Sequence, residues 1–253
     1  MLRFASLGSG SRGNANLVAS ANTLLLIDCG FTIRETELRL AELGLNADDI
    51  TAVLVTHEHG DHIRGVGPLA RKYGLPVWMT FGTARHRGLG QLPELNIINC
   101  QWGFSIGDID IVPVVVPHDA REPCQFVFRH ADRTLGLLTD LGTITPYVVD
   151  RYRDCDALML ECNHDVTLLS TGPYPYSLKQ RVGGQWGHLN NFQAAGLLEQ
   201  LDVARLQHLV VSHISEVNNT AALARAALEP VVVDDNHLVL ATQDAGFDWL
   251  ALN

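Results

Sequence analysis

The sequence predicts an α/β fold in which two β-sheets are covered by helices. Short apolar runs typical of buried strands alternate with helical segments along the chain, and sets of strands occur in both halves. The chain has 253 residues, of which 47% are hydrophobic and 18% are charged, which is ample for a large core. Because no linker, repeat or low-complexity segment interrupts it, we expect residues 1–253 to form a single domain.

The first half opens with three predicted strands, which are Leu2–Leu7, Asn16–Ala19 and Leu24–Asp28. A helix follows, because Thr32 can cap its start, Glu35 stands at the capping-box position and Gly44 can end it. The other elements expected in this half are the strand Ala52–Thr56, a helix over about His62–Tyr73 and the strand Val77–Thr80.

The second half begins with a strand-rich stretch and then alternates strands with helical segments. The predicted strands are Asn96–Cys100, Ile109–Val116, Cys124–Phe128, Thr134–Thr139, Ala157–Glu161 and Gln207–Ser212. Each half therefore contributes strands followed by helices, which is the pattern that places helices on the outer faces of two sheets.

The composition limits the cellular compartment and the class of binding partner that we expect for the protein. The five cysteines are scattered without a CxxC pair, which favours free thiols in a reducing cytoplasm. No apolar stretch reaches the roughly 18 residues of a membrane helix, so no membrane contact is expected, and the first residues resemble a strand rather than a signal peptide. The net charge of −10 argues against a general nucleic-acid binder, although bound dications or a local basic strip would weaken that argument.

The most informative stretch directly follows the predicted strand Ala52–Thr56. Four potential metal ligands, His57, His59, Asp61 and His62, lie within six residues. Alternate side chains of an extended segment point the same way, so the first two histidines can bind one ion together. The other two ligands come after a glycine, where the chain can turn toward a second ion. A histidine-rich loop without a metal is the alternative, but such clusters favour a metal site.

Three later strands also end in a potential ligand. The residues in question are His118, Asp140 and His213. Taken singly, each is more often a turn or cap residue. Together, and in this order after the histidine-rich loop, they indicate one site assembled from several strand ends. Imidazoles combined with carboxylates suit zinc or manganese, and two close ions can generate a hydroxide near neutral pH.

At this point the sequence resembles the metallo-β-lactamase superfamily. The ordered pattern is an Asp after a strand, then H-x-H-x-D-H, then His, Asp and His, which here are Asp28, His57, His59, Asp61, His62, His118, Asp140 and His213. The resemblance implies a four-layer αββα sandwich with the site at the sheet edges. It implies two ions, one held by His57, His59 and His118, the other by Asp61, His62 and His213, with Asp140 as the bridge. Asp28 would orient a ligand from behind.

Two segments point to the phosphodiesterase branch of this superfamily. The stretches Asp156–Asp165 and Gly187–Asn191 resemble the paired Glu and His segments of tRNase Z-type enzymes. By that resemblance His188, positioned by Glu161, lies beside the scissile phosphate and assists departure of the leaving oxygen. The alternative for this histidine is a capping residue at a helix start. The intact Asp140 disfavours true β-lactamases, whose pattern often has Cys at this position.

A closer resemblance is to the YycJ (WalJ) group of small superfamily members. It is carried by Ser6–Asn14, Glu161–Asp165, Gly172–Tyr176 with Lys179–Arg181, and Ser212–Asn219. The group implies 5′-to-3′ exonuclease activity on double-stranded DNA, with a metal-bound hydroxide as nucleophile and Asp61 acting in catalysis as well as in metal binding. The segment 183–187 departs from the group's usual pattern, which puts the local loop shape in doubt. The inserted domain of RNase J-type nucleases is missing.

Weaker candidates surround this constellation. Possible substrate contacts are Ser9, Ser11 and Asn14 in a Gly/Ser loop that is equally consistent with a turn, and Lys179, Arg181 and Asn190. His164 is a candidate for support of the site, against an ordinary capping role. Four histidines without a motif are interpreted as structural, namely His86, His130, His208 and His237.

Two alternative functions stay open at this stage. One is a glyoxalase II-like thioesterase or a small cyclic phosphodiesterase of the same fold. The other is a non-catalytic metal-binding regulator, which the complete ligand set disfavours. The native metal, the choice between DNA and RNA, and the oligomeric state are not predicted.

Overall fold

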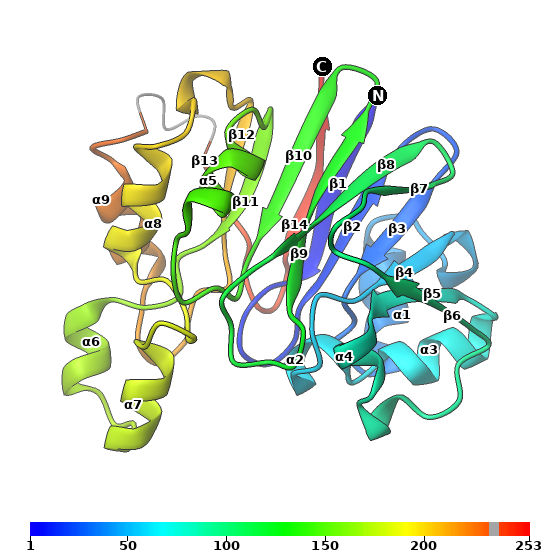
Figure 1. Cartoon of the computed structure of the whole chain (residues 1–253), viewed down its shortest axis with the longest axis horizontal. Helices are drawn as coiled ribbons and strands as arrows, with labels where there is room; N and C mark the ends of the chain where they lie inside the picture. The colour runs from blue at the N-terminus through cyan, green and yellow to red at the C-terminus, as the bar shows by residue number, and fades with distance from the viewer. Residues whose placement is uncertain (233–237) are drawn as a thin grey trace.

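The computed structural model describes residues 1–232 and 238–253, which form two facing β-sheets with helices on the outer faces (Figure 1). In spatial order the first sheet contains β14 (Phe247–Leu252), β1 (Leu2–Gly8), β2 (Ala15–Ala19), β3 (Leu24–Ile27), β4 (Ala52–Leu54), β5 (Pro76–Thr80) and β6 (Glu94–Ile98). The second contains β13 (Leu238–Leu240), β12 (His208–Ser212), β11 (Ala157–Glu161), β10 (Arg133–Leu138), β9 (Cys124–His130), β8 (Ile109–Val115) and β7 (Phe104–Ile106). The predicted αββα sandwich is confirmed.

Helices from each half cover the sheet of that half. Those of the first half are α1 (Ile33–Glu42), α2 (Gly60–Ile63), α3 (Val66–Tyr73) and α4 (Phe81–Ala84). Those of the second are α5 (Pro146–Tyr152), α6 (Val166–Thr171), α7 (Tyr176–Val182), α8 (Asn191–Leu198) and α9 (Ala221–Leu228). Short 3₁₀ turns are η1 (Ala47–Asp49), η2 (Arg87–Leu89) and η3 (Val203–Arg205). Helices α6 and α7 project from the body in Figure 1, and α7 has no buried residue. None of the described helices is long and apolar enough to cross a membrane.

Alternating side chains of the strands fill three apolar layers. In β11, Ala157 and Met159 pack between the sheets, while Leu158 and Leu160 pack under the helices of the second half. This is the period-two pattern of a strand that is buried on both faces. Phe126 of β9 is fully buried between the sheets, and truncating such a residue to alanine costs about 3–5 kcal/mol.

The carboxyl ends of parallel strands bring the chemistry-bearing residues together. Strands β3 to β6 run parallel to one another in the first sheet, and β10 to β13 do so in the second. Ligands of open α/β sheets bind at such ends. Asp28 directly follows β3, Asp140 comes soon after β10, and His213 directly follows β12.

The helix predicted over His62–Tyr73 is wrong as a single element, because α2 and α3 are separate and Gly65 lies between them. Its amide donates to the carbonyl of Cys29 at 2.7 Å, and a Cβ there would stand 2.2 Å from the carbonyl oxygen of Phe31. The predicted strand Asn96–Cys100 lies two residues too late, since β6 pairs with β5 from Glu94 to Ile98.

Strands β7, β13 and β14 were not predicted at all. Strand β14 pairs with β1 from the opposite end of the chain, so its partner cannot be read from neighbouring residues. The remaining predicted strands and the helix that Thr32 caps are confirmed to within a few residues.

Candidate metal centre

The backbone turns sharply at three of the residues that face the candidate centre. Asp28, Asp140 and His213 have φ angles of 62°, 52° and 52°, in the left-handed region that non-glycine residues seldom adopt. This backbone conformation costs about 1–3 kcal/mol of folding free energy at each such residue, so contacts with the surrounding residues must stabilise it. The amide of Asp28 donates to Leu54 O at 2.8 Å, and that of His213 donates to Ser9 Oγ at 2.8 Å.

Three imidazoles form the first group of possible ligands. His57 Nε2 lies 3.0 Å from His59 Nδ1, which in turn lies 3.2 Å from His118 Nε2. The first two point to the same side of an extended segment, as their spacing predicts. His57 follows β4, and His118 comes soon after β8 in the other sheet. The first group therefore bridges the two sheets.

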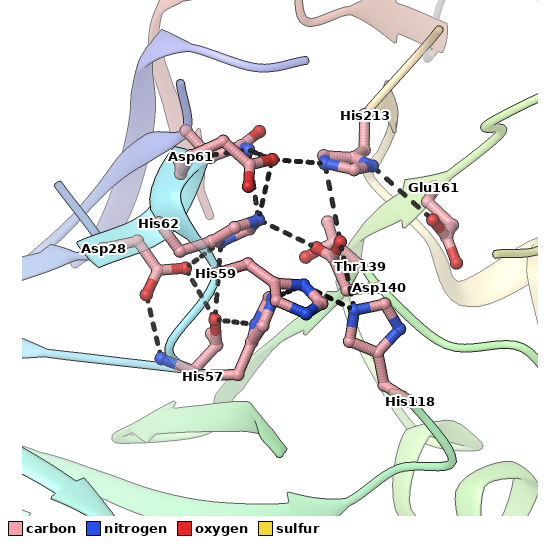
Figure 2. Close-up of polar contacts among 12 residues, drawn as sticks. Asp28, His57, His59, Asp61, His62, His118, Thr139, Asp140, Glu161 and His213 are labelled. Carbon is pink, nitrogen blue, oxygen red and sulfur yellow. Dashed lines mark hydrogen bonds and ion pairs between the residues drawn. The ribbon is translucent and has the colours of Figure 1, made fainter. Parts of the chain in front are cut away.

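The second group combines one carboxylate with two imidazoles. Asp61 Oδ2 lies 3.5 Å from His62 Nε2 and 3.6 Å from His213 Nε2. Asp140 stands between the groups, with oxygens 3.4 Å from His62 Nε2, 3.5 Å from His213 Nε2 and 3.9 Å from His118 Nε2 (Figure 2). The position of Asp140 is that of a bridging ligand.

Unpartnered polar atoms at the centre test whether metal ions fit. Asp140 Oδ2 and His213 Nε2 are buried and have no hydrogen-bond partner among the described residues. Buried polar atoms are rarely left in this state. Ligand atoms of His57, His59 and His118 lie within 4.8 Å of one another, and so do those of Asp61, His62 and His213. Buried histidine and aspartate donors in such groups fit divalent metal ions.

The two groups differ in protonation. Burial, reinforced by the charge of His62, lowers the pKa of His57 well below its ordinary value, and burial also lowers that of His118. Burial acts in the same direction on His62 and His213, but Asp140 and the other carboxylates outweigh it. They raise the pKa of His62 well above its ordinary value and that of His213 to about 10. In the metal-free protein, the second group therefore holds protons.

Hydrogen bonds behind the ligands fix which ring nitrogen faces the centre. The backbone amide and hydroxyl of Thr56 donate to Asp28 at 2.8 Å each, so the hydroxyl accepts from His57 Nδ1 at 3.0 Å. Asp28 Oδ2 also accepts from His62 Nδ1 at 2.8 Å, and Gly187 O accepts from His118 Nδ1 at 2.9 Å. The Nε2 atom of each ring then faces the centre.

Glu161 and His188 form a pair on one side of the centre. His188 Nδ1 lies 3.1 Å from Glu161 Oε2 and 3.6 Å from Asp140 Oδ1. Glu161 Oε1 accepts from the amides of Leu141 and Leu189 at 2.9 and 3.1 Å. Burial opposes ionisation of this carboxyl, but His188 lowers the pKa of Glu161 to about 2. His188 is also close enough to Asp140 and His118 to belong to a possible ligand group.

A cavity of about 370 Å³ opens over the centre, and Asp61, Asp140, His188 and His213 line it. Helix α7 contributes Arg181 to its wall. Substrate can therefore reach the predicted ligands and His188 from one side.

Three residues that support the centre were missed from the sequence. Asp119 lies 3.5 Å from His59 Nε2 and forms an ion pair with Arg181. Thr56 joins Asp28 to His57, and Asn163 Nδ2 lies 3.3 Å from His213 Nδ1. A carboxylate directly after His118 was a signal for the first of these. No local pattern marks Thr56 or Asn163.

The predicted substrate contacts fall into two sets. Ser11 and Arg181 line the cavity. Ser9 and Asn14 are buried under the loop, where Asn14 contacts Asp61 and His62 at 3.3 and 3.2 Å. Both of these residues thus brace the centre from behind.

Three further candidates lie away from this cavity. Lys179 donates to Ser170 O at 2.7 Å, and Asn190 caps α8 through Gln193. His164 is buried beside them, and burial lowers its pKa to about 4. Of the histidines interpreted as structural, His237 lies outside the described residues.

Comparisons with known proteins show the family and the fold of the chain. A family model of the β-lactamase superfamily domain matches residues 23–214. The chain is 36% identical over 235 residues to exodeoxyribonuclease YycJ of Bacillus anthracis, covering 91% of this chain and 89% of that protein. It is 32% identical over 253 residues to exodeoxyribonuclease WalJ of Streptococcus pneumoniae, covering 98% and 92%. The metallo-β-lactamase fold protein YhfI of Bacillus subtilis shares the fold, with a TM-score of 0.76 at 18% identity and 98% coverage of each chain.

Proposed function

The chain belongs to the β-lactamase superfamily and within it to the family of the YycJ and WalJ exodeoxyribonucleases, and from this premise we propose that it is a dimetal phosphodiesterase acting on DNA. The 5′-to-3′ direction and a cytoplasmic location belong to the same proposal. The observation that carries it is the Glu161–His188 pair, because His188 lines the cavity beside Asp140 while the buried Glu161 contacts it from behind. We also propose that residues 1–253 act as one domain, because one apolar layer contains residues of both sheets.

The residues that would hold two divalent ions are those of the two groups, with Asp140 between them. Their mixture of imidazoles and carboxylates suits zinc or manganese. When bound, the ions supply a water of lowered pKa and positive charge for the developing charge on the phosphate. Asp61 faces the cavity and is placed to orient the attacking water as well as to hold an ion.

His188 is placed to donate a proton to the leaving oxygen. Because its Nδ1 faces the ionised Glu161, the Nδ1 hydrogen points there and Nε2 is left to carry a second proton. Glu161 is held by two backbone amides, so it fixes the orientation of the ring. A general acid of this kind contributes about 10²–10⁴ in rate.

The proposal is tested by offering several substrate classes to one preparation. Purified protein is incubated with labelled duplex DNA, single-stranded DNA, RNA, a nitrophenyl phosphodiester, a thioester and a β-lactam, each with zinc and with manganese. We expect metal-dependent cleavage of the phosphodiesters, with DNA preferred and no β-lactam turnover. Strong thioester turnover without phosphodiester cleavage would move the function to the glyoxalase II-like class. Metal binding without any turnover would indicate a regulator.

A further inference from the structure

A second cavity of about 590 Å³ lies next to the one over the centre. The two cavities share Ser11, Gly60 and Asp61 in their walls, so they form one continuous surface. Three arginines line the second cavity, Arg12, Arg39 and Arg64, and we call it the Arg64 pocket. Any polymer that leaves the centre past Asp61 therefore crosses this pocket.

Two of these arginines already have partners. Arg39 donates to Glu35 at 2.9 Å and to the carbonyl of Gln243 at 3.1 Å, and its guanidinium stacks on Phe31 at 4.2 Å. Arg12 donates to the carboxylates of Glu216 at 2.9 Å and Asp244 at 2.7 Å. These pairs fix the shape of the wall and cancel most of its charge.

Arg64 has no such partner. Its side chain is exposed, and none of the carboxylates in residues 1–232 and 238–253 forms an ion pair or hydrogen bond with it. Of the carboxylates in the pocket wall, Glu35 is bound to Arg39, and Asp61 faces His62 and His213. Among the described residues, Arg64 is therefore the arginine of the pocket wall whose guanidinium has no carboxylate partner, and an incoming anion can bind it.

The centre itself gives the direction in which a substrate strand extends. The two nitrogens of His213 face opposite ways, Nε2 toward Asp61 and Nδ1 toward Glu161 (Figure 2). Glu161 and His188 mark the side of the leaving oxygen. The attacking and leaving oxygens lie in line through the phosphorus, so the part of the substrate that keeps the cleaved phosphate departs to one side of that line, and the Arg64 pocket is the open surface that continues from Asp61.

We propose that the Arg64 pocket is a subsite for the phosphodiester backbone of the strand that retains the cleaved phosphate, with Arg64 as its anionic contact. This inference rests on the proposed function, and it adds the path of the strand to that function. The proposal predicts that the length of the substrate matters, because the contact with Arg64 requires a strand that extends beyond Asp61.

The test compares two substrates and two arginines. The variants are Arg64→Ala, Arg64→Glu and Arg64→Lys, with Arg153→Ala as the control. Arg153 is also exposed but lies at the far end of α5, away from both cavities. The kcat/KM is measured on a dinucleotide and on a single strand of about 12 nucleotides, a length within the range of single-strand sites. Binding of the same strand is followed by fluorescence anisotropy at several salt concentrations in metal-free buffer.

We expect Arg64→Ala to lower the kcat/KM on the strand about tenfold relative to the kcat/KM on the dinucleotide, mainly by raising KM on the strand. The slope of the logarithm of the binding constant against the logarithm of the salt concentration should become smaller by about one. Arg64→Glu should lower the ratio further, Arg64→Lys should restore most of it, and Arg153→Ala should give the wild-type ratio. A wild-type ratio and salt slope in Arg64→Ala and Arg64→Glu would overturn the subsite while the proposed function stands. Equal losses on both substrates would overturn it too.

If wild-type protein cleaves neither substrate, the proposed function fails. In that case the anisotropy measurements still test the subsite. Strand binding that is weakened by Arg64→Ala but not by Arg153→Ala supports the subsite. Binding that is the same in all variants overturns it.

Discussion

The two groups of the candidate centre contain three possible ligands each but differ in the protonation of their imidazoles. The first consists of imidazoles alone, and two of them, His57 and His118, have lowered pKa values. The second includes a carboxylate, and its imidazoles, His62 and His213, have raised pKa values. The first group is therefore ready to bind a cation near neutral pH, whereas the second must release protons first.

The residues behind the ligands explain the difference. Behind His57 and His118 the first group has uncharged acceptors, the hydroxyl of Thr56 and the carbonyl of Gly187, and the carboxylate near His59, Asp119, is paired with Arg181. Anions surround the second, since Asp28 contacts His62 at 2.8 Å and Glu161 lies 3.7 Å from His213. A carboxylate partner raises the basicity of an imidazole in a way that a neutral acceptor does not. The contrast teaches that metal loading of this centre is coupled to protons on one side.

Removing the bridge should have the largest effect, because Asp140 serves both groups. We expect Asp140→Ala to lose most of its metal and nearly all of its activity, as measured by elemental analysis and by cleavage of labelled DNA. Asp110→Ala is a suitable control, because Asp110 is an exposed carboxylate on β8. A fully loaded Asp140→Ala protein with normal turnover would show that Asp140 is not the bridge.

His188→Ala should leave metal binding by both groups unchanged but slow the reaction. We expect near-normal metal content and a loss of about 10²–10⁴ in kcat on DNA, because the general acid is gone. A nitrophenyl phosphodiester should lose less, since its leaving group needs little proton donation. An equal loss on both substrates would favour a role in phosphate binding, and lost metal would make His188 a ligand. Unchanged rates on both would leave it as a capping residue.

Lowering the pH should weaken metal binding by the second group before it weakens metal binding by the first. Because the pKa of His213 is about 10 in the metal-free protein and that of His62 is also raised, both rings are protonated at pH 7, and an ion must displace both protons. Apparent affinity should then fall up to about 100-fold per pH unit for the second ion and much less for the first. Calorimetric zinc titrations between pH 6 and 8 would measure this, and two sites of equal pH dependence would contradict the contrast.

Asp28→Asn should give the smallest of these effects and sharpen the comparison. The neutral amide keeps the size of the side chain but removes the charge beside His62, so the second group should lose about 10–100-fold in metal affinity. Thr56→Val removes the hydroxyl that His57 donates to and should weaken the first group instead. The same titration reads both variants, and a reversed or identical pattern would refute this assignment of partners.

The sequence was most informative where chemistry and chain position coincide. The gathering of the residues from His57 to His62 with Asp140 and His213 at one place could be predicted, because a buried strand followed by a possible ligand is a local pattern. Thr56 and Asn163 could not, because their roles depend on contacts with His57 and His213 that only the folded chain creates. The last strand was missed for the same reason, since β14 pairs with β1.

The most direct test of the central claim is a metal titration read by activity. Chelator-treated protein is given increasing equivalents of zinc or manganese, and cleavage of 5′-labelled duplex DNA is measured at each step and at pH 6, 7 and 8. We expect no cleavage without metal, and activity that rises mainly as the second equivalent binds, with that second step shifting to higher metal concentration in acid. Full activity in the metal-free protein, or after one equivalent at every pH, would contradict it.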